Sequence, residues 1–194
     1  MKGPRMNIYV LGGAAMAFIS YIPLTIAVWR KTLKQNFATY ALWGLLDTIA
    51  AGSIMLKGGN FLLPAMYVAC CFGILIGILR TRTFSWGKLE TLISVLVVIS
   101  IGVWMLVGDR EATIVSSVGV GLAGLPQLVD FWKKPVGAPL LEYIGFSIAN
   151  GLSLYGGADW SISERFYSSV CLALTLSFVL VIVFRQRFSS HRLA

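Results

Sequence analysis

The chain is poor in cysteine and histidine, and each scarcity excludes a class of protein. It has three cysteines and one histidine in 194 residues. Cys70 and Cys71 are adjacent in one apolar run and Cys171 lies in another, so we expect small core residues rather than the disulfide framework of a secreted domain. His191 stands alone in the polar carboxyl-terminal tail. A single imidazole makes neither a metal site nor a catalytic triad, and we expect no metal and no cofactor.

Charged residues are also scarce. Only 12% of the residues are charged, whereas 57% are hydrophobic, which is the composition of a membrane protein. The 16 Lys and Arg outnumber the 8 Asp and Glu, but they lie in short gaps between apolar runs instead of forming the patches of a nucleic-acid-binding protein. The lipid bilayer is therefore the expected partner, and nucleic acid is not. Membrane enzymes usually gather acidic or histidine side chains at one surface, and no such cluster occurs, so we do not expect an enzyme.

Long apolar runs fill most of the chain. About 20 apolar residues are enough to cross the hydrocarbon core as a helix. The expected membrane-spanning helices are 8–29, 38–56, 61–79, 89–106, 113–132, 140–155 and 166–184. The first run is too long for the apolar segment of a signal peptide, so we expect it to be retained. The sequence thus predicts an all-α integral membrane protein with seven transmembrane helices.

Small residues mark faces on which these helices can pack closely. Gly12 and Gly13 lie in the first run, and Gly73 and Gly77 form a Gly-x-x-x-Gly pair in the third. The letters Gly-x-Gly-x-x-Gly at 119–124 match a nucleotide-binding fingerprint, but they lie inside a membrane-length run and not between a strand and a helix. We expect helix packing, not nucleotide binding, to explain them.

The basic residues between the predicted helices indicate an orientation. With the amino terminus outside, the inner loops and tail hold eleven Lys and Arg, and the outer segments hold five. The inner residues are Arg30, Lys31, Lys34, Arg80, Arg82, Lys88, Lys133, Lys134, Arg185, Arg187 and Arg192, and the outer ones are Lys2, Arg5, Lys57, Arg110 and Arg165. This positive-inside bias predicts an outer amino terminus and a cytoplasmic carboxyl terminus. The membrane that we expect is the cytoplasmic (inner) membrane of a bacterium.

A pattern that runs from Ile22 to Asp47 returns, without gaps, 103 positions later. The matched pairs are Pro23 and Pro126, Trp29 and Trp132, Arg30 and Lys133, Lys31 and Lys134, Tyr40 and Tyr143, Trp43 and Phe146, and Asp47 and Asn150. Two three-helix units in the same orientation need an odd number of spacer helices between them. We therefore predict a 3+1+3 arrangement, with repeats at 8–82 and 112–188 and a linker helix at 86–108, and a substrate path between the two halves.

Two short signatures inside the repeats resemble those of PQ-loop proteins. Gly124-Leu125-Pro126-Gln127, followed by Trp132-Lys133-Lys134, is similar to the PQ-loop signature, and the segment 21–24 with 29–31 resembles its weaker partner, with Leu24 in the place of the glutamine. The resemblance covers nearly the whole chain and extends to the related SWEET sugar transporters. It implies a secondary transporter of 3+1+3 architecture that works by alternating access, with hinges at Pro23, Pro126 and Gln127.

Asp47 is the acidic residue nearest the centre of a predicted helix. Leu45-Leu46-Asp47, followed by Ala51-Gly52-Ser53, is similar to the proton-coupling segment of cystinosin-type members, which implies that Asp47 exchanges protons. Here the aspartate lies in the first unit and Asn150 in the second, the reverse of the cystinosin arrangement. A charged, unpaired carboxylate at bilayer depth costs several kcal/mol, so Asp47 should face the bundle interior or a wet cavity. A structural aspartate bonded to a neighbouring helix is the alternative.

Helical spacing groups aromatic residues with the two polar ones. Facing stripes of the second and sixth helices would form a pocket with aromatic walls, suited to sugar rings and to planar or cationic solutes. Plain packing is the alternative for these stripes. The expected substrate-binding residues are Tyr40, Trp43, Asp47, Tyr143, Phe146 and Asn150.

Two further acidic residues lie near inner helix ends. Asp130 and Glu142 are each within about two turns of such an end, beside Lys133 and Lys134. A surface salt bridge accounts for Glu142. For Asp130, a salt bridge and a cytoplasmic gate both remain open.

We expect a secondary transporter of a small polar solute such as a sugar, an amino acid or a vitamin. The sequence leaves open which solute it is, whether protons are coupled through Asp47, and whether the chain forms a homo-oligomer. The alternative is a ligand-binding receptor or sorting protein of the same architecture, which the KDEL receptor exemplifies. A retinal protein is disfavoured because the run at 166–184 contains no lysine for a Schiff base.

Overall fold

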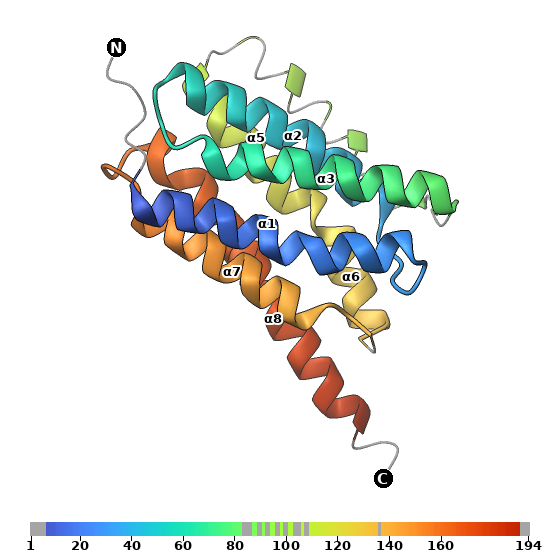
Figure 1. Ribbon diagram of the computed structural model, residues 1–194. Helices are drawn as coiled ribbons and strands as arrows, with labels where there is room; N and C mark the ends of the chain where they lie inside the picture. Colours follow the sequence, from blue (N-terminus) through green and yellow to red (C-terminus); the bar gives the residue numbers. More distant parts are fainter. Residues whose placement is uncertain are drawn as a thin grey trace.

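Every element of secondary structure in the described part of the chain is helical. The computed structural model describes residues 7–82, 87, 88, 91, 94, 95, 98, 101, 102, 106, 109–135 and 137–190. Its helices are α1 (Ile8–Trp29), α2 (Phe37–Leu56), α3 (Leu62–Thr81), α5 (Asp109–Ala123), α6 (Leu125–Lys133), α7 (Leu140–Tyr155), the π-helix η1 (Ile162–Phe166) and α8 (Tyr167–Ser190) (Figure 1). The all-α prediction is confirmed. The linker helix predicted at 86–108 falls largely outside the described residues.

Local side-chain chemistry explains where the first helices begin and end. The side chain of Asn7 accepts hydrogen bonds from the backbone N–H groups of Tyr9 and Val10, and that of Asn36 accepts one from Thr39. Both caps satisfy donors that the first turn of a helix cannot pair internally. The predicted starts at 8 and 38 therefore lie within one residue of the observed ones.

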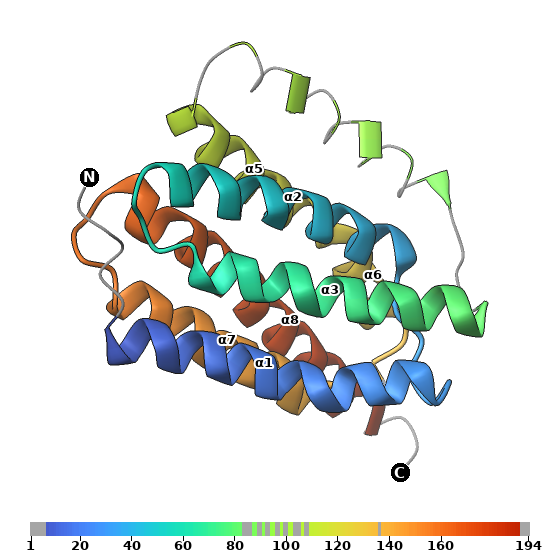
Figure 2. The ribbon, with the colours of Figure 1, turned by 45° about the horizontal axis from the view of Figure 1, so that its top comes forward.

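The helices pack as two groups, each with its third helix in contact with its other members. The first group is α1, α2 and α3, in which α3 packs against both α1 and α2. The second group is α5–α6, α7 and α8, in which α8 packs against the others. Between the groups, α1 lies along α7 and α2 lies along α5 (Figure 2). The first helix of each group thus packs on the second helix of the other.

The helices run alternately between two ends of the bundle. The first helix runs from an end marked by Asn7 to an end marked by Trp29, and we use these residues to name the two ends. The rings of Tyr9 and Tyr155 are 4.8 Å apart, which places the last turn of α7 at the Asn7 end. The Trp29 end carries most of the basic residues of the described chain.

Five helical segments are long and apolar enough to cross a membrane. They are Ile8–Trp29, Phe37–Leu56, Leu62–Thr81, Glu111–Lys133 and Ile162–Phe188. Large apolar side chains such as Phe18, Phe72 and Leu180 are exposed on their outer faces, which is how helices meet lipid tails. The length and composition of these helices therefore indicate a membrane protein.

Glycines permit the closest helix contacts. A Cβ atom added at Gly13 would lie 2.8 Å from the carbonyl oxygen of Ala149, so the backbones of α1 and α7 approach each other at this point. A Cβ atom at Gly77 would lie 2.5 Å from the Trp29 ring. Within 119–124 the nearest neighbours are side chains of α2 and α8. The predicted packing role is confirmed for Gly13, Gly77, Gly119 and Gly124, whereas a Cβ atom at Gly12 or Gly73 would come no closer than 3.8 or 4.0 Å to a neighbouring side chain.

Both groups carry the same contact at the Trp29 end. The guanidinium carbon of Arg80, in α3, lies 5.3 Å from the centroid of the Trp29 ring, and that of Arg185, in α8, lies 5.0 Å from the Trp132 ring. Arg185 also donates from Nε to the Trp132 carbonyl oxygen at 2.9 Å. Both are cation–π contacts between the third and the first helix of a group. The tryptophans are one of the pairs matched 103 positions apart in the sequence.

The two matched prolines lie in different surroundings. Pro23 is inside the continuous helix α1, whereas Pro126 is the second residue of α6, directly after a break at Gly124. The span predicted at 113–132 lies within Glu111–Lys133, which is long and apolar enough to cross a membrane, but it is interrupted at Gly124, where α5 ends and α6 begins. Proline has no N–H for the carbonyl of Leu122, and its ring crowds the preceding turn.

Candidate functional site

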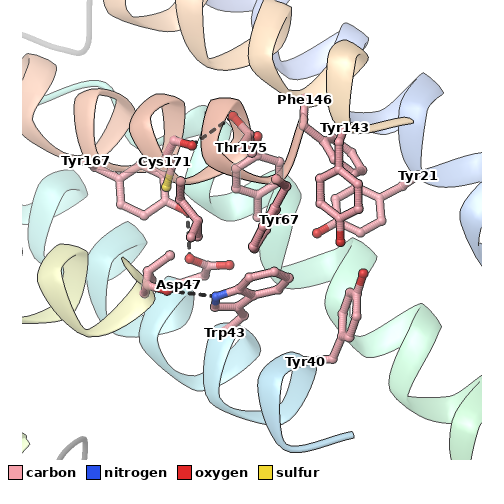
Figure 3. A pocket seen from close by; sticks show the side chains of 13 residues that line it. Tyr21, Tyr40, Trp43, Asp47, Tyr67, Tyr143, Phe146, Tyr167, Cys171 and Thr175 are labelled. Atoms are coloured by element: carbon pink, nitrogen blue, oxygen red, sulfur yellow. Dashed lines mark hydrogen bonds between the residues drawn. The ribbon is translucent and has the colours of Figure 1, made fainter. Parts of the chain in front are cut away.

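A small cavity lies between the two groups of helices, at the level of the middle of α2 (Figure 3). Its volume is about 40 Å³, which is room for about three water molecules. All of its lining residues except Leu174 are buried. They are Tyr21, Tyr40, Trp43, Asp47, Tyr67, Val120, Tyr143, Phe146, Tyr167, Cys171, Leu174, Thr175 and Phe178.

Asp47 projects from α2 into this cavity, and its side chain is only 2% exposed. The hydroxyl of Tyr167 donates a hydrogen bond of 2.6 Å to its Oδ1 atom. Tyr167 is the first residue of α8 and follows η1 directly. Short π-helical segments inside longer helices often occur at functional sites, and here one sets the position of the aspartate's partner.

Asn150 has in α7 the position that Asp47 has in α2, and it is fully buried. Its Nδ2 atom donates to the Phe146 carbonyl at 2.8 Å, while its Oδ1 atom has no hydrogen-bond partner in the described part of the chain. The hydroxyl of Tyr67, from α3, lies near this amide and has no hydrogen-bond partner there either. Asp47 of α2 therefore faces a tyrosine of α8, and Asn150 of α7 faces a tyrosine of α3. In both cases the tyrosine comes from the third helix of the other group.

Aromatic rings form most of the cavity wall. The indole Nε1 of Trp43 donates to the Val120 carbonyl at 2.9 Å, which joins α2 to α5 and fixes the ring (Figure 3). The Tyr40 ring packs edge-on against Trp43, with centroids 5.2 Å apart. The hydroxyl of Tyr143 is buried and has no hydrogen-bond partner among the described residues. Buried hydroxyls beside a cavity can bind a polar solute or water.

At the Trp29 end, aromatic side chains close the cavity. The rings of Phe131, Tyr143 and Phe178 pack against one another in T-shaped contacts, with centroids 4.9–5.6 Å apart. Beyond them, the side-chain oxygen of Gln127 accepts a hydrogen bond of 3.4 Å from the backbone N–H of Asn36. The three rings all belong to the second group, whereas the bond between Asn36 and Gln127 joins the two groups.

At the Asn7 end, the closure is polar. Asn60, in the loop between α2 and α3, donates to the Ser153 hydroxyl at 3.0 Å, and that hydroxyl lies 3.0 Å from the hydroxyl of Ser168. Asn7 donates to the carbonyl of Gly156 at 2.7 Å. The bonds of Asn60 and Asn7 join the two groups at this end, whereas the contact between Ser153 and Ser168 lies within the second group.

A wider hollow of about 490 Å³ lies at the Asn7 end, beside η1. Its lining residues are Lys57, Thr113, Trp160, Ser161, Ile162 and Ser163. The guanidinium carbon of Arg165 lies 4.2 Å from the centroid of the Trp160 ring, so an exposed cation–π pair stands next to this hollow.

The structure brings most of the predicted site residues together. Five of the six expected binding residues line the cavity, namely Tyr40, Trp43, Asp47, Tyr143 and Phe146. The sixth, Asn150, is buried beside Tyr67. The predicted hinge residue Gln127 is buried at the closure of the Trp29 end, next to Pro126, whereas Pro23 lies within α1. Asp130 is exposed on α6 and does not line the cavity.

Several cavity residues were not expected from the sequence. Tyr67 and Tyr167 come from the third helix of each group. The residue stripes compared in the sequence lie on the second and sixth predicted helices only, so they do not include these two tyrosines. Tyrosines inside apolar runs could have indicated these positions, because a buried tyrosine hydroxyl needs a hydrogen-bond partner. Tyr21 stands two positions before Pro23 in the signature and also lines the cavity.

No model of a known protein family matches the chain, and no curated protein matches it significantly either.

Proposed function

We propose that the protein is a secondary membrane transporter that moves a small polar solute through the central cavity by alternating access. The observation that carries the proposal is the burial of the Asp47 carboxylate, at mid-helix depth, in a cavity between two groups of helices. A charge at that depth is expensive and is expected where solutes or protons pass. In this proposal the 3+1+3 architecture of PQ-loop and SWEET-type proteins applies, with the linker helix at 86–108.

The contacts at the two ends of the cavity suggest how access to it could alternate. Opening the Trp29 end requires loss of the bond between Gln127 and Asn36, which joins the two groups, and movement of the Phe131, Tyr143 and Phe178 rings, which all belong to the second group. Opening the Asn7 end requires loss of the polar bonds at Ser153 and Gly156. The bonds of Asn36 to Gln127, Asn60 to Ser153 and Asn7 to Gly156 join one group to the other. In this proposal, rocking of the groups breaks the bonds at one end while those at the other end are kept.

The orientation in this proposal places the Asn7 end outside and the Trp29 end in the cytoplasm. The basic side chains at the Trp29 end, including Arg80 and Arg185 on their tryptophans, favour the cytoplasmic side. In this orientation the hollow beside η1 lies on the outer side of the membrane.

Flux in proteoliposomes tests the proposal. A panel of sugars, amino acids and vitamins is assayed with and without an imposed pH gradient, for the wild-type chain and for Asp47→Asn. We expect protein-dependent flux of at least one solute and loss of its response to the pH gradient in the variant. Tight binding in detergent without any flux would support the receptor alternative instead.

A further inference from the structure

The composition of the cavity wall indicates the charge of the solute. Eight of its residues are aromatic, and Asp47 is the only charged residue among the described residues that line it. The faces of Tyr and Trp rings attract cations, and a carboxylate adds a full negative charge. An anion would be repelled at this site, and a neutral solute would leave the charge of an ionised Asp47 without compensation.

No basic group from the neighbouring helices offsets the carboxylate. The titratable groups that face Asp47 are Tyr167 and Cys171 from α8 and Tyr67 and Cys71 from α3. The remaining helices contribute Tyr21, Tyr40, Trp43, Val120, Tyr143 and Phe146 to the cavity, and none of these carries a basic side chain. A cation at Asp47 must therefore come from outside the wall of the cavity.

We propose that the transported solute is a small organic cation, and that this cation and a proton occupy Asp47 alternately. The inference rests on the proposed transport function and names its substrate class and its mode of coupling. When the cation binds, the Asp47 carboxylic acid releases its proton and the carboxylate pairs with the cation. When the cation leaves, the carboxylate takes up a proton. The site has the same net charge in both states, so the protein exchanges one cation for one proton.

The size of the cavity favours a compact cation. Room for about three water molecules corresponds to a solute of about four non-hydrogen atoms. Guanidinium has this size, its plane can stack on an aromatic ring, and its N–H groups can donate to a carboxylate in pairs. The hydroxyls of Tyr67 and Tyr143 offer it further acceptors. Urea has the same shape without the charge and is the matched control solute.

Binding to the purified full-length chain in detergent tests the cation site. We expect calorimetry in buffers of different ionisation enthalpy to show that guanidinium binding releases about one proton on the acidic side of the pH range. Urea should not bind. Asp47→Asn should weaken guanidinium binding by about 30-fold or more, because one partner of a buried charge pair is lost. Asp47→Glu should retain binding, and Asp159→Asn, in an exposed loop, should leave it unchanged.

Flux measurements separate this inference from the general transport proposal. In proteoliposomes, an acidic interior should drive the accumulation of labelled guanidinium, and clamping the membrane potential at zero should not reduce it. Binding of urea as tight as that of guanidinium, or guanidinium binding without proton release at any pH, would overturn the inference. Flux of a neutral solute without guanidinium flux would also overturn it and leave the transport function intact. Guanidinium binding with proton release but without any flux would support the cation site and refute transport.

Discussion

The hydroxyl of Tyr167 donates to the Asp47 carboxylate across 2.6 Å, and this bond joins the second helix of one group to the third helix of the other. The two residues are 120 positions apart in the chain. Because Tyr167 directly follows η1, a change in the winding of that segment would move the hydroxyl relative to the carboxylate. The bond therefore couples the aspartate to the geometry of the helix that begins at the Asn7 end.

Replacing Tyr167 by phenylalanine removes the hydrogen bond and keeps the ring. We expect Tyr167→Phe to lower the free energy of unfolding by about 1–3 kcal/mol, because a buried carboxyl group loses its donor. The midpoint of thermal unfolding in detergent measures the change. A double-mutant cycle with Asp47→Asn should give a coupling energy of at least about 0.5 kcal/mol. The control is Tyr155→Phe at the exposed end of α7, and additive effects at positions 47 and 167 would contradict the prediction.

Replacing Pro126 by alanine supplies a backbone N–H at the break between α5 and α6. In a helix interior, alanine is more favourable than proline by about 3 kcal/mol. The substitution should therefore stabilise a conformation in which α5 and α6 form one continuous helix. If the break is a hinge, Pro126→Ala slows solute flux several-fold without lowering the unfolding temperature, whereas Pro23→Ala, within continuous α1, has a smaller effect. Pro64→Ala, in the first turn of α3, serves as the control. Equal flux in all four proteins would exclude a hinge at Pro126.

We expect alanine substitutions at two adjacent glycines of α1 to have opposite effects on stability. An added Cβ at Gly13 meets backbone atoms of α7, 2.8 Å from the Ala149 oxygen, whereas one at Gly12 comes no closer than 3.8 Å to the Leu152 side chain. Gly13→Ala should therefore destabilise the protein by about 1–3 kcal/mol through overpacking. Gly12→Ala should be neutral or stabilising by up to about 1 kcal/mol. Thermal unfolding of the two variants in detergent gives the comparison, and a stable Gly13→Ala protein would show that α1 and α7 are less close than described.

Cysteine labelling tests the orientation in the membrane. The natural cysteines at 70, 71 and 171 are buried, so background labelling should be low. Ser161→Cys, at the Asn7 end, should react with an impermeant maleimide added to intact cells. Thr32→Cys, in the turn after α1, should react only after the membrane is permeabilised. The reverse pattern would invert the proposed topology.

Much of the local structure follows from the sequence alone. Helices are predicted at 8–29 and 140–155 with the bounds that are observed. The first is of spanning length, and a membrane-spanning segment must satisfy its backbone hydrogen bonds internally, whereas α7, with 16 residues, is not among the segments long enough to cross a membrane. The spacing of Tyr40, Trp43 and Asp47 on one helix face was likewise readable, and these residues do share a cavity. The break at Gly124 was not predicted, because a proline in an apolar run is compatible with a bent helix or an interrupted one.

The sequence by itself determined that this is a helical membrane protein with an acidic group at the centre of α2 and basic residues gathered at helix ends. Only the tertiary structure decided that Tyr167 is the partner of Asp47, that Tyr67 lies beside Asn150, and how large the cavity between the two groups is. The physical reason is that lipid tails are as apolar as leucine side chains, so hydropathy does not distinguish a face that meets lipid from one that meets another helix. That choice depends on close packing at residues such as Gly13, which involves pairs of segments far apart in the chain.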